Sequence, residues 1–339
     1  MRTCTKAGVI IAIVLSASLL ARQLQGAMQQ NDPSLSIIPG DIPNLDLDAS
    51  QRFDLDRAMA RHDYKRAERL LLDEADRNPN SLRSAHLLEA AGGIFFLDHQ
   101  FLKSAIAWKK AEAIAPIDER SSFTLAMAYI KLNRRDWGRQ QLEKLSAAHP
   151  ANPLYLYWLA RMDYDAQNYS SAISRLQTAT AIDPQMMRAF DLLGLCYDYV
   201  GQMNEALKNY GRAVELNRQQ LKPSPWPNVD LAVSLIAANR LPEAEENLRE
   251  ALRHDPNLPQ AHYQLGRVLE LQGRDQDSLQ SLQRASELDP AYAEPHYLLG
   301  RIYQKLGQPE KAKSEIQKFR NLTKNTERHA TASSAPSSD

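Results

Sequence analysis

The most regular pair of chemically functional side chains in this sequence is a tyrosine followed four residues later by an arginine. The pair occurs three times, as Tyr157 and Arg161, Tyr263 and Arg267, and Tyr297 and Arg301. In a helix this spacing places both side chains on one face. An aromatic surface beside a guanidinium suits an extended segment with acidic groups, because arginine can form two hydrogen bonds to one carboxylate. The alternatives are an intramolecular stack of ring and guanidinium, or plain solvent exposure.

Histidine is not arranged for metal binding or acid–base catalysis. Of the 8 histidines, His262 and His296 occupy equivalent places in similar segments, and His62 and His99 fall in expected turns. No His-Glu-x-x-His or Cys-x-x-Cys spacing occurs in the sequence. We therefore expect no metal site and no cofactor.

Nucleophilic catalysis also lacks a motif, because the sequence contains no G-x-S-x-G, no S-x-x-K and no phosphate-binding loop. Cys196 follows Gly194 on an apolar helical stripe, where small-volume packing is its expected role, and Cys4 lies too far away for an expected disulfide. The 41 basic and 41 acidic residues cancel, so no global field would attract nucleic acid or an anionic membrane surface. We expect no catalytic residues, no nucleic-acid partner and no small-molecule substrate.

The segments that carry these residues recur with a period of 34 residues. Prolines close the segments, a small residue stands twelve positions before each proline, and a large apolar residue stands eight positions before it. The prolines are Pro116, Pro150, Pro184, Pro256 and Pro290, the small residues Ser104, Gly138, Ala172, Ala244 and Ser278, and the apolar residues Trp108, Leu142, Leu176, Leu248 and Leu282. A fixed period of this kind indicates a stacked array of repeated units.

Each unit is predicted to contain two helices. In the unit beginning at Met187, apolar residues form one helical stripe up to Val200 and a second stripe from Ala206 onward. Gly194 would cost roughly 1 kcal/mol inside a helix, so we expect the paired helix to approach it closely. Residues that tolerate the left-handed conformation lie between the two stripes: Asn133, Gly201, Asn239, Gly273 and Gly307.

The run Phe190-x2-Leu193-Gly194-x2-Tyr197, followed by Ala206-x3-Tyr210 and Ala213, resembles the tetratricopeptide repeat signature. Two later units nearly restate it. The resemblance implies an all-α, right-handed superhelical solenoid of about eight helix-turn-helix repeats, a non-enzymatic fold whose first helices line a concave peptide-binding groove. It assigns repeat packing to Gly194, Ala206, Gly266, Gly300 and Ala312. The paired Lys and Asn residues that clamp a C-terminal carboxylate in some members do not carry over.

Steps of 34 residues place the units at about 48–81, 85–118, 119–152, 153–186, 187–220, 225–258, 259–292 and 293–326. An insertion at 221–224 leads into Pro225, Trp226 and Pro227, and we interpret it as a stiff extended connection or as a longer surface loop. The Ser-, Thr- and Ala-rich residues 327–339 are predicted to be disordered.

The N-terminus is predicted to be an export signal at 1–28 followed by a linker at 29–47. Arg2 and Lys6 precede an apolar stretch from Ala7 to Ala21, which is shorter than the roughly 20 residues of a spanning helix. This length favours cleavage. A cut after Ala21 or Ala27 lacks a small residue three positions back, so an uncleaved anchor remains the alternative.

Two functions fit these predictions. The first is an exported scaffold, in the bacterial periplasm or cell envelope, that binds a protein or peptide partner in its groove. The second is a structural or assembly factor of the envelope, anchored in the inner membrane by residues 7–21. An enzyme ranks below both.

Overall fold

The computed structural model describes residues 45–333, with side chains as far as Lys324. The predicted signal, 1–28, and most of the predicted linker, 29–47, lie outside the described residues. The chain divides into two compact units, of which unit 1 ends at Ala148 and unit 2 begins at His149. Within the described residues the structure contains helices and no strand, which confirms the predicted all-α fold.

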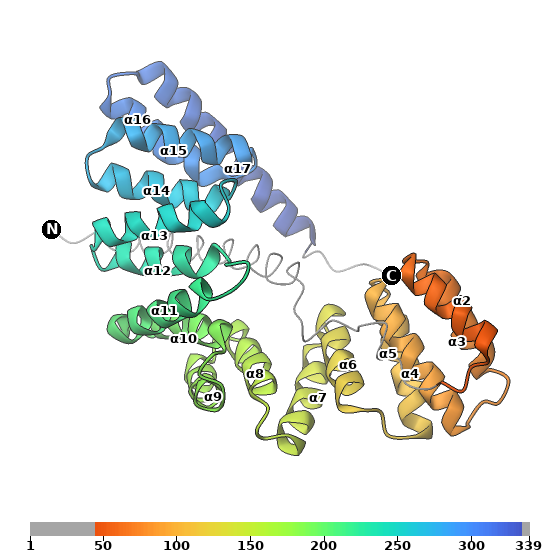
Figure 1. Cartoon of the computed structure of the whole chain (residues 1–339). Coiled ribbons are helices and arrows are strands. Elements are labelled where there is room, and N and C mark those ends of the chain that lie inside the picture. Colours follow the sequence, from red (N-terminus) through yellow and green to blue (C-terminus); the bar gives the residue numbers. More distant parts are fainter. Residues whose placement is uncertain (1–44, 334–339) are drawn as a thin grey trace. The chain divides into compact units, whose positions relative to one another are not determined.

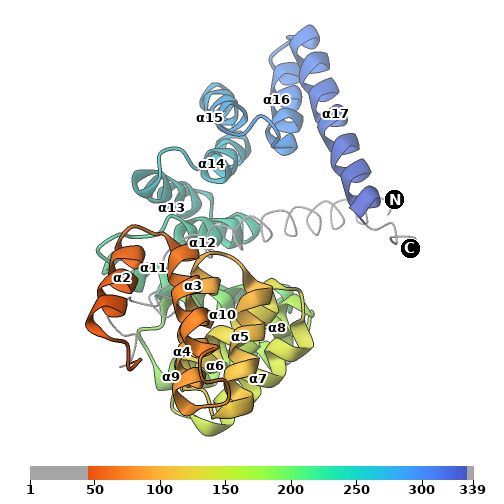
Figure 2. The same cartoon turned by 90° about the vertical axis from the view of Figure 1, so that its right-hand side faces the viewer.

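The helices follow one another in pairs (Figures 1 and 2). Unit 1 contains α2 (Ala49–Ala60), α3 (Tyr64–Ala75), α4 (Leu82–Leu97), α5 (Phe101–Ile114), α6 (Glu119–Lys131) and α7 (Arg135–Ala148). Unit 2 contains α8 (Pro153–Asp165), α9 (Tyr169–Ile182), α10 (Met187–Tyr199), α11 (Met203–Arg218), α12 (Trp226–Ala237), α13 (Leu241–His254), α14 (Pro259–Leu271), α15 (Asp275–Leu288), α16 (Ala293–Lys305) and α17 (Pro309–Ser333).

Several pairs are held by close contact between a glycine in the first helix and a large side chain in the second. A Cβ atom placed on Gly194 would lie 2.7 Å from the ring of Tyr210, and one on Gly266 would lie 2.6 Å from Leu282 Cγ. Gly300 stands in the same relation to Ile316, at 2.7 Å. The missing side chains therefore allow the paired helices to approach, which offsets the cost of glycine inside a helix.

Small residues in the second helices complete this packing. Ala206 is fully buried, and Ala312 is nearly so. Ser278 is also fully buried, and its hydroxyl donates a hydrogen bond to the carbonyl oxygen of Gly266 at 2.6 Å. That bond satisfies a hydroxyl that would otherwise be buried without a partner.

The turn inside each pair contains a residue with a left-handed backbone. The glycines and asparagines expected there have positive φ, from 57° at Asn133 to 77° at Gly273. In the three other pairs the same conformation is adopted by His62, His99 and Gln167. His62 and His99 lie in turns, as the repeat predicted, whereas the residue type of Gln167 does not indicate a left-handed backbone.

At three junctions between pairs, the second helix ends at an aspartate that precedes a proline. Asp183, Asp255 and Asp289 have extended backbone dihedrals, as the residue before proline prefers. Each carboxylate accepts a hydrogen bond from the backbone N–H two residues later, at 2.9 to 3.0 Å. These turns start the next helix in a fixed direction.

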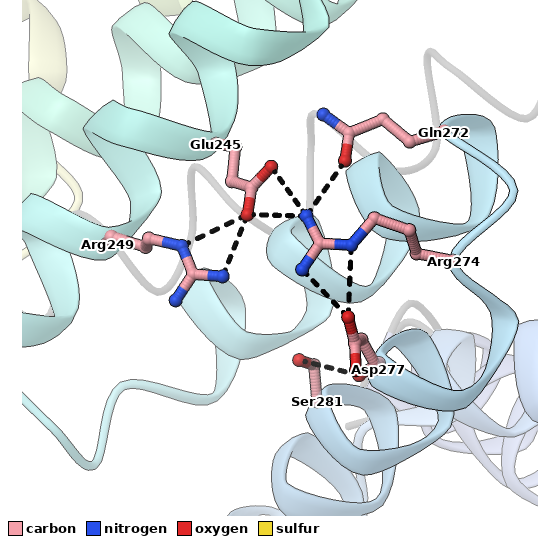
Figure 3. A network of polar contacts seen from close by, with 6 residues as sticks. All are labelled: Glu245, Arg249, Gln272, Arg274, Asp277 and Ser281. Carbon is pink, nitrogen blue, oxygen red and sulfur yellow. Dashed lines mark hydrogen bonds and ion pairs between the residues drawn. The ribbon is translucent and has the colours of Figure 1, made fainter.

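Ion pairs connect successive pairs in unit 2 (Figure 3). Arg274, at the start of α15, donates from Nη1 to both carboxylate oxygens of Glu245 on α13, at 2.9 and 3.0 Å. Arg249 donates to the same carboxylate at 2.8 Å, and Asp277 accepts from Arg274 Nη2 at 2.7 Å. Burial opposes ionisation of Glu245, but these hydrogen bonds outweigh it and lower the pKa of its carboxyl.

The Pro-rich insertion is fastened to the preceding helix. The Asn217 side chain is fully buried and makes two hydrogen bonds to the backbone of Ser224, at 2.7 and 2.8 Å. Pro225 has α-region dihedrals and caps α12, whose first turn contains Pro227. Of the two interpretations of this segment, the structure therefore agrees with the longer surface loop and not with the stiff extended connection. Proline is compatible with a first helical turn because the N–H that it lacks has no intrahelical partner there.

The last helix is longer than the predicted repeat. It continues to Ser333, so residues 327–333 are helical where we expected a disordered tail. Ala330 and its neighbours are acceptable in a helix, and no glycine or proline interrupts the chain between Pro309 and Pro336. Among the described residues, no helix has the length and apolar character needed to cross a membrane.

Candidate protein-binding surface

The first helices of the pairs in unit 2 form one continuous layer. α8 contacts α10, α10 contacts α12, α12 contacts α14, and α14 contacts α16. We call the surface of this layer the first-helix face. Each of α8, α14 and α16 in this layer contains one Tyr–Arg pair.

The first pair is rearranged by the neighbouring helix. The ring of Tyr157 lies 5.7 Å from the guanidinium of Arg188 on α10, instead of pairing with Arg161. Arg161 lies 5.9 Å from the ring of Tyr164 and 3.4 Å from the carboxylate of Asp165. Arg161 and Arg188 therefore both make cation–π contacts, but the ring of Tyr157 contacts Arg188 and not Arg161.

Arg161 and Asp191 have buried polar atoms that make no hydrogen bond to a described residue, although Arg161 Nε keeps its 3.4 Å ion pair with Asp165. Nε and Nη2 of Arg161, Oδ1 of Asp191 and Nε1 of Trp158 are covered from solvent and have no hydrogen-bond partner among the described residues. We call these three residues, with Tyr157 and Arg188, the α8–α10 cluster. A buried polar atom without a partner costs about 1–3 kcal/mol, so such atoms mark places where a further group could bind.

The electrostatics of the cluster favour a neutral Asp191. Burial raises the pKa of its carboxyl to about 7, although the nearby Arg161 guanidinium acts in the opposite direction. A carboxyl that titrates near neutrality can change its charge when a charged ligand approaches.

The second pair is mostly buried. Tyr263 is only 5% exposed, because its ring packs edge-on against Tyr292, with 5.3 Å between the ring centroids. Burial raises the pKa of its hydroxyl to about 12. Arg267 is half-buried and donates a long hydrogen bond, 3.4 Å, to Gln264. Tyr263 thus contributes little accessible ring surface, whereas the charge of Arg267 remains on the face.

The third pair is accessible and makes the intramolecular stack. Tyr297 is 42% exposed, and the guanidinium of Arg301 lies 6.0 Å from its ring. Arg301 also forms an ion pair with Glu270 on α14, at 3.0 Å. The three Tyr–Arg pairs are therefore not equivalent, although their repeat positions are.

Comparison with known sequences agrees with this geometry. The family described as TPR repeat matches residues 234–273 and 271–307, and a family described as anaphase-promoting complex, cyclosome, subunit 3 matches residues 140–213. The chain is a tetratricopeptide-repeat protein. The matched residues include the glycines Gly266 and Gly300, which the structure places against the second helices of their pairs.

Known structures show the same fold for this TPR protein. It resembles the crystal structure of the APC/C hetero-tetramer Cut9–Hcn1 with a TM-score of 0.56 and 16% identity, over 68% of this chain and 45% of that one. The crystal structure of YrrB, described as a TPR protein with an unusual peptide-binding site, is similar with a TM-score of 0.45 and 18% identity, over 57% and 98% of the two chains.

One curated relative is a cytochrome c-type biogenesis protein, CycH of Rhizobium meliloti (strain 1021). It is 30% identical to the TPR protein over 133 residues, which make up 38% of this chain and 33% of the relative. The matched part thus spans about a third of the length of CycH.

The chemically reactive side chains of the TPR protein have structural partners. Burial raises the pKa of the Cys196 thiol to about 12, so it carries little of the thiolate that nucleophilic catalysis requires. His296 bonds Glu315 at 2.6 Å, and His262 bonds the Pro256 carbonyl oxygen at 2.9 Å. Within residues 45–324, no three His, Cys, Asp or Glu side chains lie together as a metal-binding group.

Sequence reasoning did not identify two residues of the α8–α10 cluster. Arg188 and Trp158 belong to no repeated pair, so the recurring residue types did not indicate them. Asp191 stands at the repeat position of Tyr157, 34 residues later, and belongs to no Tyr–Arg pair. A charged residue at a position that is aromatic in other units was the available signal.

Proposed function

We propose that this TPR protein is a non-enzymatic scaffold that binds an extended segment of a protein partner on the first-helix face. The observation that carries the proposal is the set of buried polar atoms in the α8–α10 cluster that lack partners. A ligand backbone whose carbonyl oxygen accepts from Arg161 and whose N–H donates to Asp191 Oδ1 would recover the free energy that these missing hydrogen bonds cost.

The rest of the face supports an acidic, extended ligand. The Tyr297 ring is accessible on α16, which also carries Arg301, and Arg267 lies on the neighbouring first helix α14. Tyrosine offers contact area at low entropic cost, and arginine gives charge-assisted hydrogen bonds to a carboxylate. A ligand carboxylate would compete with Glu270 for Arg301, which makes recognition selective for acidic segments.

We further propose that the protein acts after export, in the bacterial periplasm or cell envelope. The apolar stretch from Ala7 to Ala21 supports export, and the similarity to CycH supports a role in the envelope. The second candidate is an assembly factor tethered in the inner membrane by residues 7–21. Its supporting observation is the name of that relative, a biogenesis protein.

Site-specific photocrosslinking tests the binding face. A photoreactive amino acid replaces Tyr297 on α16, and in a matched control it replaces the exposed Lys208 on the second helix α11. We expect the first position to give a defined crosslinked species in cells and the control to give none. Crosslinking only from Lys208 would reject the first-helix face as the binding surface.

A further inference from the structure

Unit 1 carries an exposed apolar surface that the proposed function does not use. Leu102 and Ile106 on α5 are 61% and 47% exposed, and Trp137 on α7 is 56% exposed. Leu102 and Ile106 are four residues apart and share a face of α5 with Lys109, three residues further on. Single exposed apolar residues need no explanation, but several on one surface indicate a binding site.

Two sets of contacts join these residues into one surface. The rings of Tyr129 and Trp137 meet edge-on, with 5.4 Å between their centroids. Burial raises the pKa of the Tyr129 hydroxyl, and the ammonium of Lys109 on α5 is near enough to act against that shift. At the other end, Lys131 Nζ lies 6.0 Å from the ring of Phe101, the residue before Leu102.

We call this surface the α5–α7 patch and define it as Phe101, Leu102, Ile106, Tyr129 and Trp137. Its side chains come from α5, from the last turn of α6, which contains Tyr129, and from the first turn of α7, which contains Trp137. All five residues belong to unit 1.

Positive charge borders the α5–α7 patch. The guanidinium of Arg134 lies 5.6 Å from the Trp137 ring, and Lys103 Nζ lies 5.6 Å from the Phe95 ring. The acidic Glu112 is already bonded to Lys109. These cations border the apolar side chains although the chain has no net charge, and Asp136 in the first turn of α7 is an acidic residue beside Trp137.

We propose that the α5–α7 patch binds the surface of an anionic lipid membrane. Leucine and isoleucine side chains can enter the boundary of the acyl chains, tryptophan and tyrosine suit the headgroup level, and lysine and arginine attract anionic headgroups. The patch combines all three classes. If the stretch from Ala7 to Ala21 stays uncleaved as an anchor, it would also hold this chain at a membrane.

The test uses the full chain and the fluorescence of Trp137. Vesicles of phosphatidylcholine with or without phosphatidylglycerol carry brominated acyl chains, which quench a tryptophan that enters the bilayer. The signal of Trp137 is the difference between the wild-type protein and the Trp137→Phe variant. This difference reports on the patch whether or not residues 7–21 insert, because both proteins share the same N-terminus.

We expect Trp137 to be quenched by vesicles with phosphatidylglycerol and much less by pure phosphatidylcholine or at high salt. The double variant Leu102→Ser/Ile106→Ser should reduce this binding roughly tenfold, because it removes two apolar side chains from the contact. The matched control is Phe53→Ser/Leu82→Ser, which changes two equally exposed apolar residues elsewhere in unit 1 and should have no effect. Unaltered thermal unfolding would show that each variant is folded.

Two results would overturn the proposal. One is the absence of Trp137-dependent quenching in anionic vesicles. The other is protection of Trp137 from iodide by polyglutamate but not by anionic vesicles, which would assign the patch to an acidic protein. Neither result bears on the first-helix face, which lies in unit 2.

Discussion

The ring of Tyr210 occupies the space that a side chain on Gly194 would need. A Cβ atom there would lie 2.7 Å from two ring carbons, closer than van der Waals contact allows. The ring cannot easily move, because Tyr210 is fully buried and its hydroxyl donates a 3.0 Å hydrogen bond to Asp198. This contact fixes the separation of α10 and α11.

Replacing Gly194 with Ala should therefore destabilise the protein, and Leu should cost roughly 1–3 kcal/mol or more by overpacking. Proteolysis should then open the middle of unit 2 first, since each repeat contacts only its neighbours. The matched control is Gly211→Ala on α11. Its added Cβ meets nothing within 4 Å, so it should stabilise by about 0.5–1 kcal/mol through higher helix propensity. Chemical denaturation measures both, and a stabilising Gly194→Ala would contradict the packing described.

The ion pair between Arg218 and Glu250 should make stability depend on acid pH. Arg218 on α11 donates to both oxygens of Glu250 on α13, at 2.8 and 2.6 Å. This bond lowers the pKa of Glu250, so the stability it contributes is present above the unfolded pKa, near 4.5, and is lost as pH falls through the folded pKa.

Arg218→Ala should accordingly lower the urea midpoint at pH 7 and leave it almost unchanged at pH 3. The expected change at pH 7 is small, because the arginine is about half exposed. Arg240→Ala is the control, since its partner Glu243 lies exposed three residues away on the surface. An equal loss at both pH values would show that Arg218 acts through packing and not through charge.

Asp191 should give a pH dependence of the opposite sign. Its pKa is raised from 3.8 to about 7, mainly by burial, so its ionised form is disfavoured in the folded protein. Its contribution is fully present below pH of about 4 and is lost as pH rises through about 7. Asp191→Asn cannot ionise. The free energy of unfolding of this variant minus that of the wild type should therefore be larger at pH 8 than at pH 4. If the free energies of unfolding of the two proteins changed in parallel with pH, the raised pKa of Asp191 would be contradicted.

Processing of the N-terminus is a separate prediction. If the stretch from Ala7 to Ala21 is a cleaved signal, mass spectrometry of the mature protein should find an N-terminus between about Arg22 and Gln30. An intact Met1 in the membrane fraction would instead establish the tethered form.

The repeat period and the helix pairs could be predicted because they depend on local residue types. Gly194, Gly266 and Gly300 were recognisable, since glycine inside a helix is costly without a close neighbour. Side-chain partners across helices were not predictable. Arg161 contacts Tyr164, and Arg188 from the next repeat contacts the Tyr157 ring. No spacing within one helix reveals a partner on another helix. The helical residues 327–333 of α17 were not predicted, because the Ser-, Thr- and Ala-rich composition of this segment suggested disorder.

The affinity of a crosslinked and identified partner for two arginine variants tests the central claim most directly. Changing Arg267 and Arg301 together to Ala should weaken binding at least tenfold, about 1.4 kcal/mol, and reduce its salt dependence without changing the helix content. The control changes Lys208 and Lys313, exposed on the second helices α11 and α17, to Ala and should leave binding unchanged. Equal affinities for the wild type and the Arg267/Arg301 variant would contradict the first-helix face as the binding surface.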